Sequence, residues 1–136
     1  MVNDRYVIDT HILIWYVDAD RRLSRNAKGI LDHPDNRFLL PAIALAEALF
    51  ILERKPEFYS LTEESLLRHV RADERIAIVA LDEIVVAKTL DCTAIPEMHD
   101  RQIVATALLA EEAGFAVAIL TRDTNITESG LVPCVW

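Results

Sequence analysis

Two aspartates, Asp9 and Asp123, follow apolar runs that read as buried strands, at residues 6–8 and 115–120. In a parallel sheet, ligands bind beyond the carboxyl ends of the strands, where a carboxylate can hold a metal ion without deep burial. Aspartate is also a favoured first residue of a helix, so capping explains Asp9 equally well when it is taken alone. We interpret Asp82, which also follows an apolar run, as a cap because its strand is expected near the sheet edge.

Two further acidic residues, Glu47 and Asp100, are expected on helices. The neighbours of Glu47 at three and four residues are all apolar: Ile43, Ala44, Phe50 and Ile51. An unpaired carboxylate on an apolar face costs free energy, so Glu47 needs an ion pair or a metal ion, and we favour the metal. Asp100 lies in the first turns of the helix expected to begin at Pro96, where stabilisation of the helix dipole would also explain an acid.

Carboxylates from four separate elements can meet in one crevice only if cations neutralise them. Hard divalent ions such as Mg²⁺ or Mn²⁺ prefer oxygen ligands and retain some water. Such ions activate a water and neutralise phosphate charge during phosphodiester hydrolysis, so no protein nucleophile is needed. No serine or cysteine is placed like an activated nucleophile, and the four histidines lack the spacing of zinc ligands. Only His99, beside Asp100, is expected near such a site.

The elements that must position these acids alternate along the chain. Apolar runs predict strands at residues 6–8, 37–40, 76–81, 115–120 and 132–136. Helical spacing and caps predict a helix from Thr10 and others at 21–32, 41–54, from about 62, at 82–90 and at 96–113. This alternation predicts an α/β fold, a three-layer α/β/α sandwich with a mostly parallel central sheet of four or five strands. We expect the first and fourth strands to be central neighbours, so that Asp9 and Asp123 face one crevice.

Length and composition suit one compact domain over residues 1–136. Hydrophobic residues make up 52% of the chain, and three glycines and five prolines leave little room for linkers. No segment is apolar enough for a membrane helix, and the charged start is unlike a secretory signal, so we expect a cytoplasmic protein. The net charge of −8 argues against a nucleic-acid partner, but metal ions would neutralise some acids, and 11 of the 14 cations are arginines, the type suited to bidentate phosphate contacts. Composition leaves the partner open.

Five segments, four of which carry these acids, follow one another in a characteristic order along the chain. They are 7–15 (VIDTHILIW), 23–27 (LSRNA), the helical Glu47, 99–107 (HDRQIVATA) and 120–123 (LTRD). In this order they resemble the motifs of PIN-domain ribonucleases over nearly the whole chain. In length and motif order the chain is similar to the VapC-type toxins of prokaryotic toxin–antitoxin pairs. One departure is His99, where related toxins often carry a Pro-Phe step before the aspartate.

This resemblance implies an endoribonuclease that depends on Mg²⁺ or Mn²⁺. Its catalytic and metal-binding acids would be Asp9, Glu47, Asp100 and Asp123. Thr10 and Thr121 match the hydroxyl residues that lie beside the family's metal site, although local backbone bonding would also explain them. The resemblance also implies an RNA substrate, a homodimer and a cognate antitoxin that inserts a segment into the active-site groove.

Arg101 and Arg122 flank two of the acids and are candidate RNA contacts, with surface salt bridges as an equally good explanation. Two other functions remain open: a noncatalytic interaction domain that keeps the fold, and a phosphoryl-accepting receiver or phosphatase. The second needs another aspartate close to the first, or a lysine at a strand end, and the sequence has neither. The mean hydropathy of +0.20 agrees with a homodimer, which we expect to form through helices of the N-terminal half.

Overall fold

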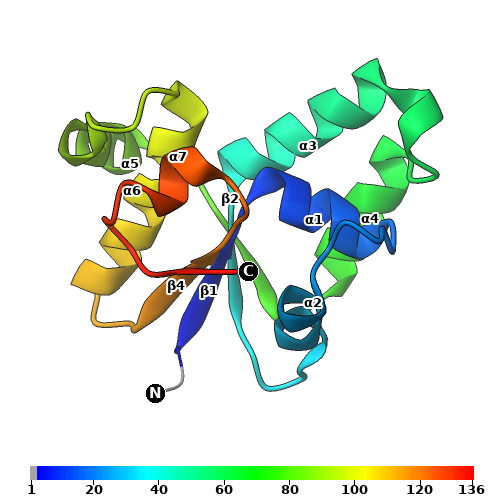
Figure 1. Ribbon diagram of the computed structural model, residues 1–136, viewed down its shortest axis with the longest axis horizontal. Coiled ribbons are helices and arrows are strands. Elements are labelled where there is room, and N and C mark those ends of the chain that lie inside the picture. Colours follow the sequence, from blue (N-terminus) through cyan, green and yellow to red (C-terminus); the bar gives the residue numbers. More distant parts are fainter. Residues whose placement is uncertain (1–2) are drawn as a thin grey trace.

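Five parallel strands form one sheet in the computed structural model, which describes residues 3–136 (Figure 1). The strands are β1 (Arg5–Ile8), β2 (Phe38–Pro41), β3 (Ile76–Val79), β4 (Val117–Leu120) and β5 (Cys134–Val135). Their order is β3-β2-β1-β4-β5, so the chain builds outward from β1 and then returns to place β4 on its other side. Ile8 at the end of β1 pairs with Leu120 at the end of β4, which confirms the expected central neighbours.

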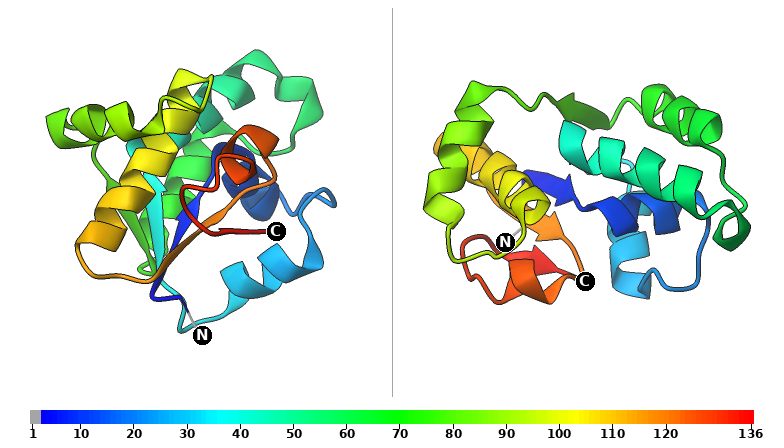
Figure 2. Two further views of the ribbon diagram at one scale, coloured as in Figure 1. Left: turned by 60° about the vertical axis from the view of Figure 1, so that its left-hand side comes forward. Right: turned by 90° about the horizontal axis from the view of Figure 1, so that it is seen from above.

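Helices cover both faces of this sheet, as the views in Figures 1 and 2 show. On one side lie α1 (Thr10–Val17), α2 (Arg25–Asp32), α3 (Ala42–Arg54) and α4 (Glu63–Ala72). On the other lie α5 (Glu83–Lys88), α6 (Met98–Glu112) and α7 (Thr124–Thr127). Two 3₁₀ turns, η1 (Pro56–Phe58) and η2 (Thr89–Cys92), complete the described elements. The predicted three-layer α/β/α sandwich is confirmed, with a sheet that is wholly parallel.

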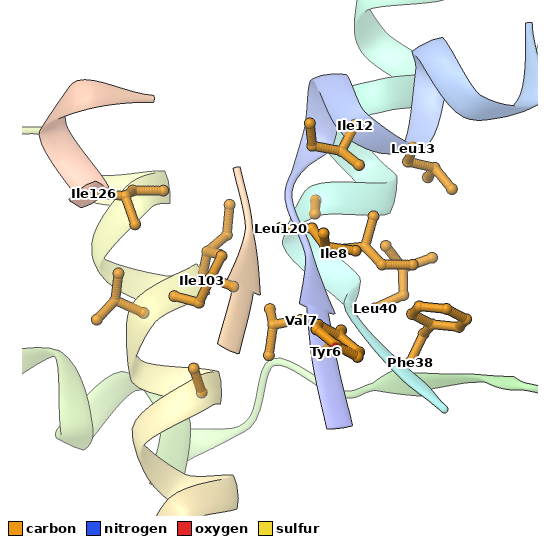
Figure 3. Packing of buried hydrophobic residues seen from close by; sticks show 14 of the residues in the cluster. Tyr6, Val7, Ile8, Ile12, Leu13, Phe38, Leu40, Ile103, Leu120 and Ile126 are labelled. Carbon is orange, nitrogen blue, oxygen red and sulfur yellow. The ribbon is translucent and has the colours of Figure 1, made fainter. Parts of the chain in front are cut away.

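The core lies on both faces of the central strands, because successive side chains of a strand point to opposite faces. Ile8 of β1 points to the side of Leu13 and Leu40, whereas Val7 points to the side of α6, which carries Ile103 (Figure 3). Each of these five side chains is at most 1% exposed. Packing from two layers therefore fixes the end of β1, where Asp9 follows. Within residues 3–136, no helix has the length and apolar character needed to cross a membrane.

The helix predicted at residues 21–32 begins later, at Arg25. Ser24 caps it as expected, through a hydroxyl that accepts a backbone N–H. Before the cap, the carboxylate of Asp20 accepts the backbone N–H of Arg22 at 2.9 Å and also binds its guanidinium. This local bonding holds the segment in a turn, which competes with helix formation.

The helix expected from Pro96 likewise begins two residues later, at Met98. The carboxylate of Glu97 accepts the backbone N–H of Asp100 at 2.8 Å and is the N-cap. The strand predicted at residues 76–81 ends at Val79, where its pairing with β2 ends. These shifts move element boundaries by two to four residues and leave every predicted acid on its expected element.

Candidate active site

Asp9 lies where β1 ends and α1 begins, and it is only 7% exposed. Its Oδ1 accepts the backbone N–H of Thr10 at 2.7 Å, and its Oδ2 accepts the hydroxyl of Thr121 at 2.6 Å. Burial raises the pKa of Asp9, the hydrogen bonds from Thr121 and Thr10 oppose that rise, and the charge of Asp123 adds to it. Asp9 is therefore a helix cap and also a member of a cluster of interacting charges.

Thr121 joins the two strand ends on which the site is built. Its side chain is fully buried just after β4, and its hydroxyl donates to Asp9. The same hydroxyl oxygen accepts the backbone N–H of Asp123 at 3.0 Å. Asp123 accepts the backbone N–H of Asn125 at 2.8 Å through Oδ1 and caps α7. One hydroxyl group thus sets the orientation of Asp9 and the backbone position of Asp123.

Glu47 reaches the same place from α3. Its Oε1 accepts the hydroxyl of Thr10 at 2.9 Å, and its Oε2 lies 3.7 Å from Nδ1 of His99. The Glu47 side chain is 32% exposed, and Phe50, which was expected to share an apolar face with it, is 57% exposed. Solvent therefore reaches this carboxylate more than the sequence suggested. The threonine beside Asp9 orients the Glu47 carboxylate, as Thr121 orients that of Asp9.

Asp100, in the first turn of α6, is 8% exposed. Burial, followed by the negative charges of Asp123 and Asp9, raises the pKa of Asp100 to about 7, and Glu97 and Glu47 add to the rise. Within residues 3–136, no salt bridge joins a lysine or arginine to any of the four predicted acids. The cluster therefore holds negative charge that the described cations of the protein do not pair with directly.

All four predicted acids line one surface hollow of about 330 Å³. The other residues that line it are Thr10, His11, Ile12, Trp15 and Arg122. Arg101 is not brought to this hollow, because its guanidinium donates to the backbone carbonyl oxygens of Thr93 and Ile95 before α6. A larger hollow of about 930 Å³ lies between α1, α2 and α4, shares Trp15 with the first, and contains none of the four acids.

His99, Glu97 and His11 also lie near the four acids, and the sequence indicated only the first of them. His99 was expected near the site, and its Nδ1 lies 2.9 Å from Oε1 of Glu97 and 3.7 Å from Glu47. Glu97 was not identified, although it stands three residues before Asp100, which is the spacing of a helix cap. His11 was also missed, because an exposed histidine on α1 has no distinguishing pattern in the sequence.

The donor set of the hollow suits a hydrated Mg²⁺ or Mn²⁺ ion. Four of its lining residues offer carboxylate oxygens, which hard divalent ions prefer. In the described part of the chain, no three histidine, cysteine, aspartate or glutamate side chains already surround a point where an ion could sit. Mg²⁺ is commonly held by one or two carboxylates and keeps several waters, so a complete protein cage is not required. A cation here would relieve the repulsion that raises the pKa of Asp100.

The fold and the site together define a class of protein. The sequence profile of the PIN domain matches residues 6–130, and the chain therefore belongs to the PIN-domain family. A comparison with curated proteins found no match. The sequence-based prediction of a PIN domain is confirmed.

Several solved structures share this fold over almost their whole length. FitAcB from Neisseria gonorrhoeae is 20% identical, with 96% of each chain covered and a TM-score of 0.62. A toxin–antitoxin complex from Klebsiella pneumoniae is also 20% identical, with 96% of each chain covered and a TM-score of 0.63. VapBC2 from Rickettsia felis, bound to a DNA fragment from its promoter, is 14% identical, covers 96% of this chain and 97% of the other, and has a TM-score of 0.65. At these identities the likeness is one of fold.

Proposed function

We propose that this protein is a metal-dependent endoribonuclease that hydrolyses phosphodiester bonds in RNA, with residues 1–136 acting as one nuclease domain. One observation carries the proposal: four carboxylates from four elements line a single hollow and form no salt bridge with a described lysine or arginine. A structural ion-pair network would pair such acids with arginines. Membership of the PIN-domain family supports the same conclusion. Repulsion between these partly buried acids destabilises the fold, and such destabilising clusters are typical of functional sites, here one that binds cations.

In this proposal Asp9, Asp100 and Asp123 would bind Mg²⁺ or Mn²⁺, and Glu47 would bind it or orient a water. The bound ion supplies an activated water and neutralises charge on the phosphate. Thr121 holds Asp9 in one orientation, and Thr10 does the same for Glu47.

Of the described residues that line the hollow, Arg122 is the only lysine or arginine, and it is exposed. We therefore propose it as the contact to an RNA phosphate. Arg101 is better explained as a structural residue, because its donors are used by backbone carbonyl groups.

The proposal is tested by incubating the purified protein with single-stranded and structured RNA, with Mg²⁺ or Mn²⁺ and with EDTA. Cleavage is expected with either metal and not with EDTA. Asp9→Asn, which keeps the shape of the side chain but removes its charge, is expected to lower the rate about a hundredfold or more. Undiminished cleavage in EDTA would exclude the metal mechanism.

A matched control for Asp9→Asn is Asp82→Asn. Asp82 also follows a strand and caps a helix, since its Oδ1 accepts the backbone N–H of Val85 at 3.0 Å, but it lies outside the hollow. Asp82→Asn is expected to cost some stability and to leave the cleavage rate unchanged. Equal losses of activity in both variants would mean that Asp9 acts only as a helix cap.

We further propose that the protein is the toxin of a toxin–antitoxin pair and acts in the cytoplasm. The similar chains in the solved structures come from assemblies such as VapBC2 and the Klebsiella toxin–antitoxin complex. The hollow of about 930 Å³ beside the acid cluster is a surface on which an antitoxin segment could lie before it reaches the site, because the two hollows share Trp15. Expression of the protein should arrest growth, and co-expression of the product of the adjacent open reading frame should relieve the arrest.

A further inference from the structure

An aromatic and cationic cluster borders one side of the acid hollow. His11 and Arg122 are exposed and line the hollow, together with Trp15. The ring of Trp136 packs edge-on against Trp15, with 5.9 Å between centroids, and the guanidinium of Arg122 lies 5.7 Å from the centroid of Trp136. The ring of His11 lies 5.7 Å from that of Trp15. Trp15 is therefore the buried base of a cluster whose more exposed members are His11, Arg122 and Trp136.

The backbone holds this cluster in place beside the acids. The backbone N–H of Thr121 donates to the carbonyl oxygen of Val135 at 3.2 Å, so Trp136 begins next to the strand end that carries the site. The side-chain amide of Asn26 donates to the backbone oxygen of Trp136 at 3.0 Å. Trp15 is 7% exposed, and its indole N–H has no hydrogen-bond acceptor among residues 3–136. The cluster is thus organised before a ligand arrives, with one donor still unsatisfied.

The negative net charge of the molecule bears on how this cluster would contribute to RNA binding. The net charge is −8, and four acids but only one arginine line the hollow, so lysine and arginine side chains there offer little direct attraction to an RNA phosphate. Proteins that bind single-stranded nucleic acid obtain affinity from bases stacked on aromatic rings and on arginine planes. The exposed parts of His11, Arg122 and Trp136 are groups of this kind, placed directly beside the acids.

We propose that His11, Arg122 and Trp136 form a base-stacking subsite that binds an unpaired nucleobase next to the phosphate in the acid hollow. The inference rests on the proposed ribonuclease function, because it assigns the substrate as RNA with an unstacked base at this position. Arg122 contributes its guanidinium plane to the base as well as its charge to the phosphate. The subsite selects single-stranded or looped RNA, since a base within a duplex is not free to stack on protein side chains.

Tryptophan fluorescence tests the subsite directly, because the only two tryptophans of the chain, Trp15 and Trp136, both belong to the cluster. The experiment uses full-length Asp9→Asn protein with Mg²⁺, so that the probe is not consumed. One probe is a short single-stranded oligouridylate, and the other is the same ribose-phosphate chain without bases. Quenching by the first and not by the second is expected, because only a base can stack on the indole.

Trp136→Leu and Arg122→Gln are the test variants, and affinity for a labelled oligouridylate is measured by fluorescence anisotropy. Loss of one stacked aromatic is expected to weaken binding roughly five- to a hundredfold. In otherwise wild-type protein, Trp136→Leu should raise KM and change kcat little, because the stack is present before and during the reaction. If Trp136→Leu fails to fold, Arg122→Gln is measured with both probes. A loss of affinity that is larger for the oligouridylate than for the chain without bases is expected, because loss of a phosphate contact alone would weaken both equally.

Phe115→Leu is the matched control. Phe115 lies before the opposite end of β4, where the guanidinium of Arg5 is 4.5 Å from its ring centroid. This aromatic–arginine pair resembles that of Trp136 and Arg122 but lies outside the acid hollow, so Phe115→Leu should leave oligouridylate affinity and KM unchanged. An equal loss of affinity in Phe115→Leu and Trp136→Leu would show a general effect on the fold and would overturn the subsite.

The results separate this inference from the proposed function. Cleavage by the wild type together with equal quenching by both probes would overturn the subsite and leave the ribonuclease intact. Base-dependent quenching that is lost in Trp136→Leu or Arg122→Gln, without cleavage under any metal condition, would support the subsite and overturn the nuclease. No quenching by either probe, with unchanged affinity in both variants, would also overturn the subsite.

Discussion

Thr121 is the residue on which the geometry of the site depends most. Its hydroxyl is buried, donates to Asp9 and accepts from the backbone of Asp123, so it joins two of the four acids. Hydrogen bonds of this kind fix the orientation of groups that bind metal, and their loss typically lowers metal affinity or activity by about ten- to a hundredfold.

Thr121→Val removes this hydroxyl with little change in shape. We expect cleavage to fall about ten- to a hundredfold and stability to fall by about 1–3 kcal/mol, because the Asp123 N–H is left without its acceptor. The control is Thr106→Val, since Thr106 is also buried but its hydroxyl donates within α6, to Gln102. Thr106→Val should leave cleavage unchanged. Full activity in Thr121→Val, measured with the same RNA, would mean that this hydroxyl does not support the site.

Asp100 gives the metal-free protein a predictable dependence on pH. Its folded-state pKa of about 7 lies above the ordinary value of 3.8, so folding binds a proton between these two values. As pH rises from about 4 to about 7, the stability of the metal-free protein should fall, and above pH 7 this group should cause no further loss. A divalent ion competes with the same proton, so Mn²⁺ should stabilise the wild type more at pH 8 than at pH 5.5.

Asp100→Asn removes the titrating charge and should therefore raise the melting temperature in EDTA. The gain should be larger at pH 8 than at pH 5.5, because the wild-type protein loses stability over that interval. The same variant should gain less stability from added Mn²⁺ than the wild type does. The measurement is a set of thermal scans of both proteins at the two pH values, with EDTA or Mn²⁺. A variant that is less stable in EDTA and responds fully to Mn²⁺ would exclude a shared site.

At the scale of elements, the central strands of the sheet could be predicted from sequence, but the packing of the helices against one another could not. Apolar composition alone predicted strands at residues 6–8 and 115–120, and the structure has them at Arg5–Ile8 and Val117–Leu120, with Phe115 exposed before the second. The positions of Asp9 and Asp123 follow from the strand order. The contact between Thr10 and Glu47 depends on how α3 packs against α1, which no local pattern encodes. Arg101 shows the same limit, because backbone carbonyl groups in the loop before α6 take its donors.

Two glycines at different places on helices should respond in opposite ways to alanine. Gly114 follows α6 with φ of +102°, a conformation that favours glycine, so Gly114→Ala should destabilise the fold by about 1 kcal/mol or more. Gly29 lies inside α2, and a Cβ there meets no atom within 4 Å, so Gly29→Ala should stabilise the fold by about 0.5–1 kcal/mol. Urea titrations of both variants measure the signs. Equal effects would mean that α2 or the end of α6 differs from its described form.

At the scale of the whole molecule, the exposed apolar surface bears on self-association. Among residues 3–136, nine large apolar side chains are exposed, and six of them lie between Ile78 and Met98. The homodimer expected from sequence was assigned to helices of the N-terminal half, yet most of this surface belongs to the edge strand β3, the segment after it, α5, η2 and the start of α6. We propose this stretch as an alternative to the N-terminal helices for the homodimer interface, and its six exposed side chains, Ile78, Leu81, Ile84, Val86, Leu90 and Met98, are the ones to test.

A stable dimer buries about 800 Å² on each partner, and six large apolar side chains that are at least 40% exposed supply a substantial part of such an area. Ile84 is 59% exposed on α5, so Ile84→Glu should place two charges in a symmetric interface and convert the dimer to a monomer. Phe58→Glu is the control, because Phe58 is 66% exposed but lies in η1, far along the chain from this surface.

Light scattering at micromolar concentration should therefore give the mass of two chains for the wild type and for Phe58→Glu, and of one chain for Ile84→Glu. A dimer that survives Ile84→Glu but not Phe58→Glu would move the interface to the α3–α4 side of the molecule, nearer to the helices of the N-terminal half. A wild-type protein that remains a monomer would exclude the proposed homodimer. In that case the apolar side chains between Ile78 and Met98 would be exposed in the isolated chain, and the antitoxin would be the next partner to test. The test is whether Ile84→Glu weakens binding of the antitoxin to this protein.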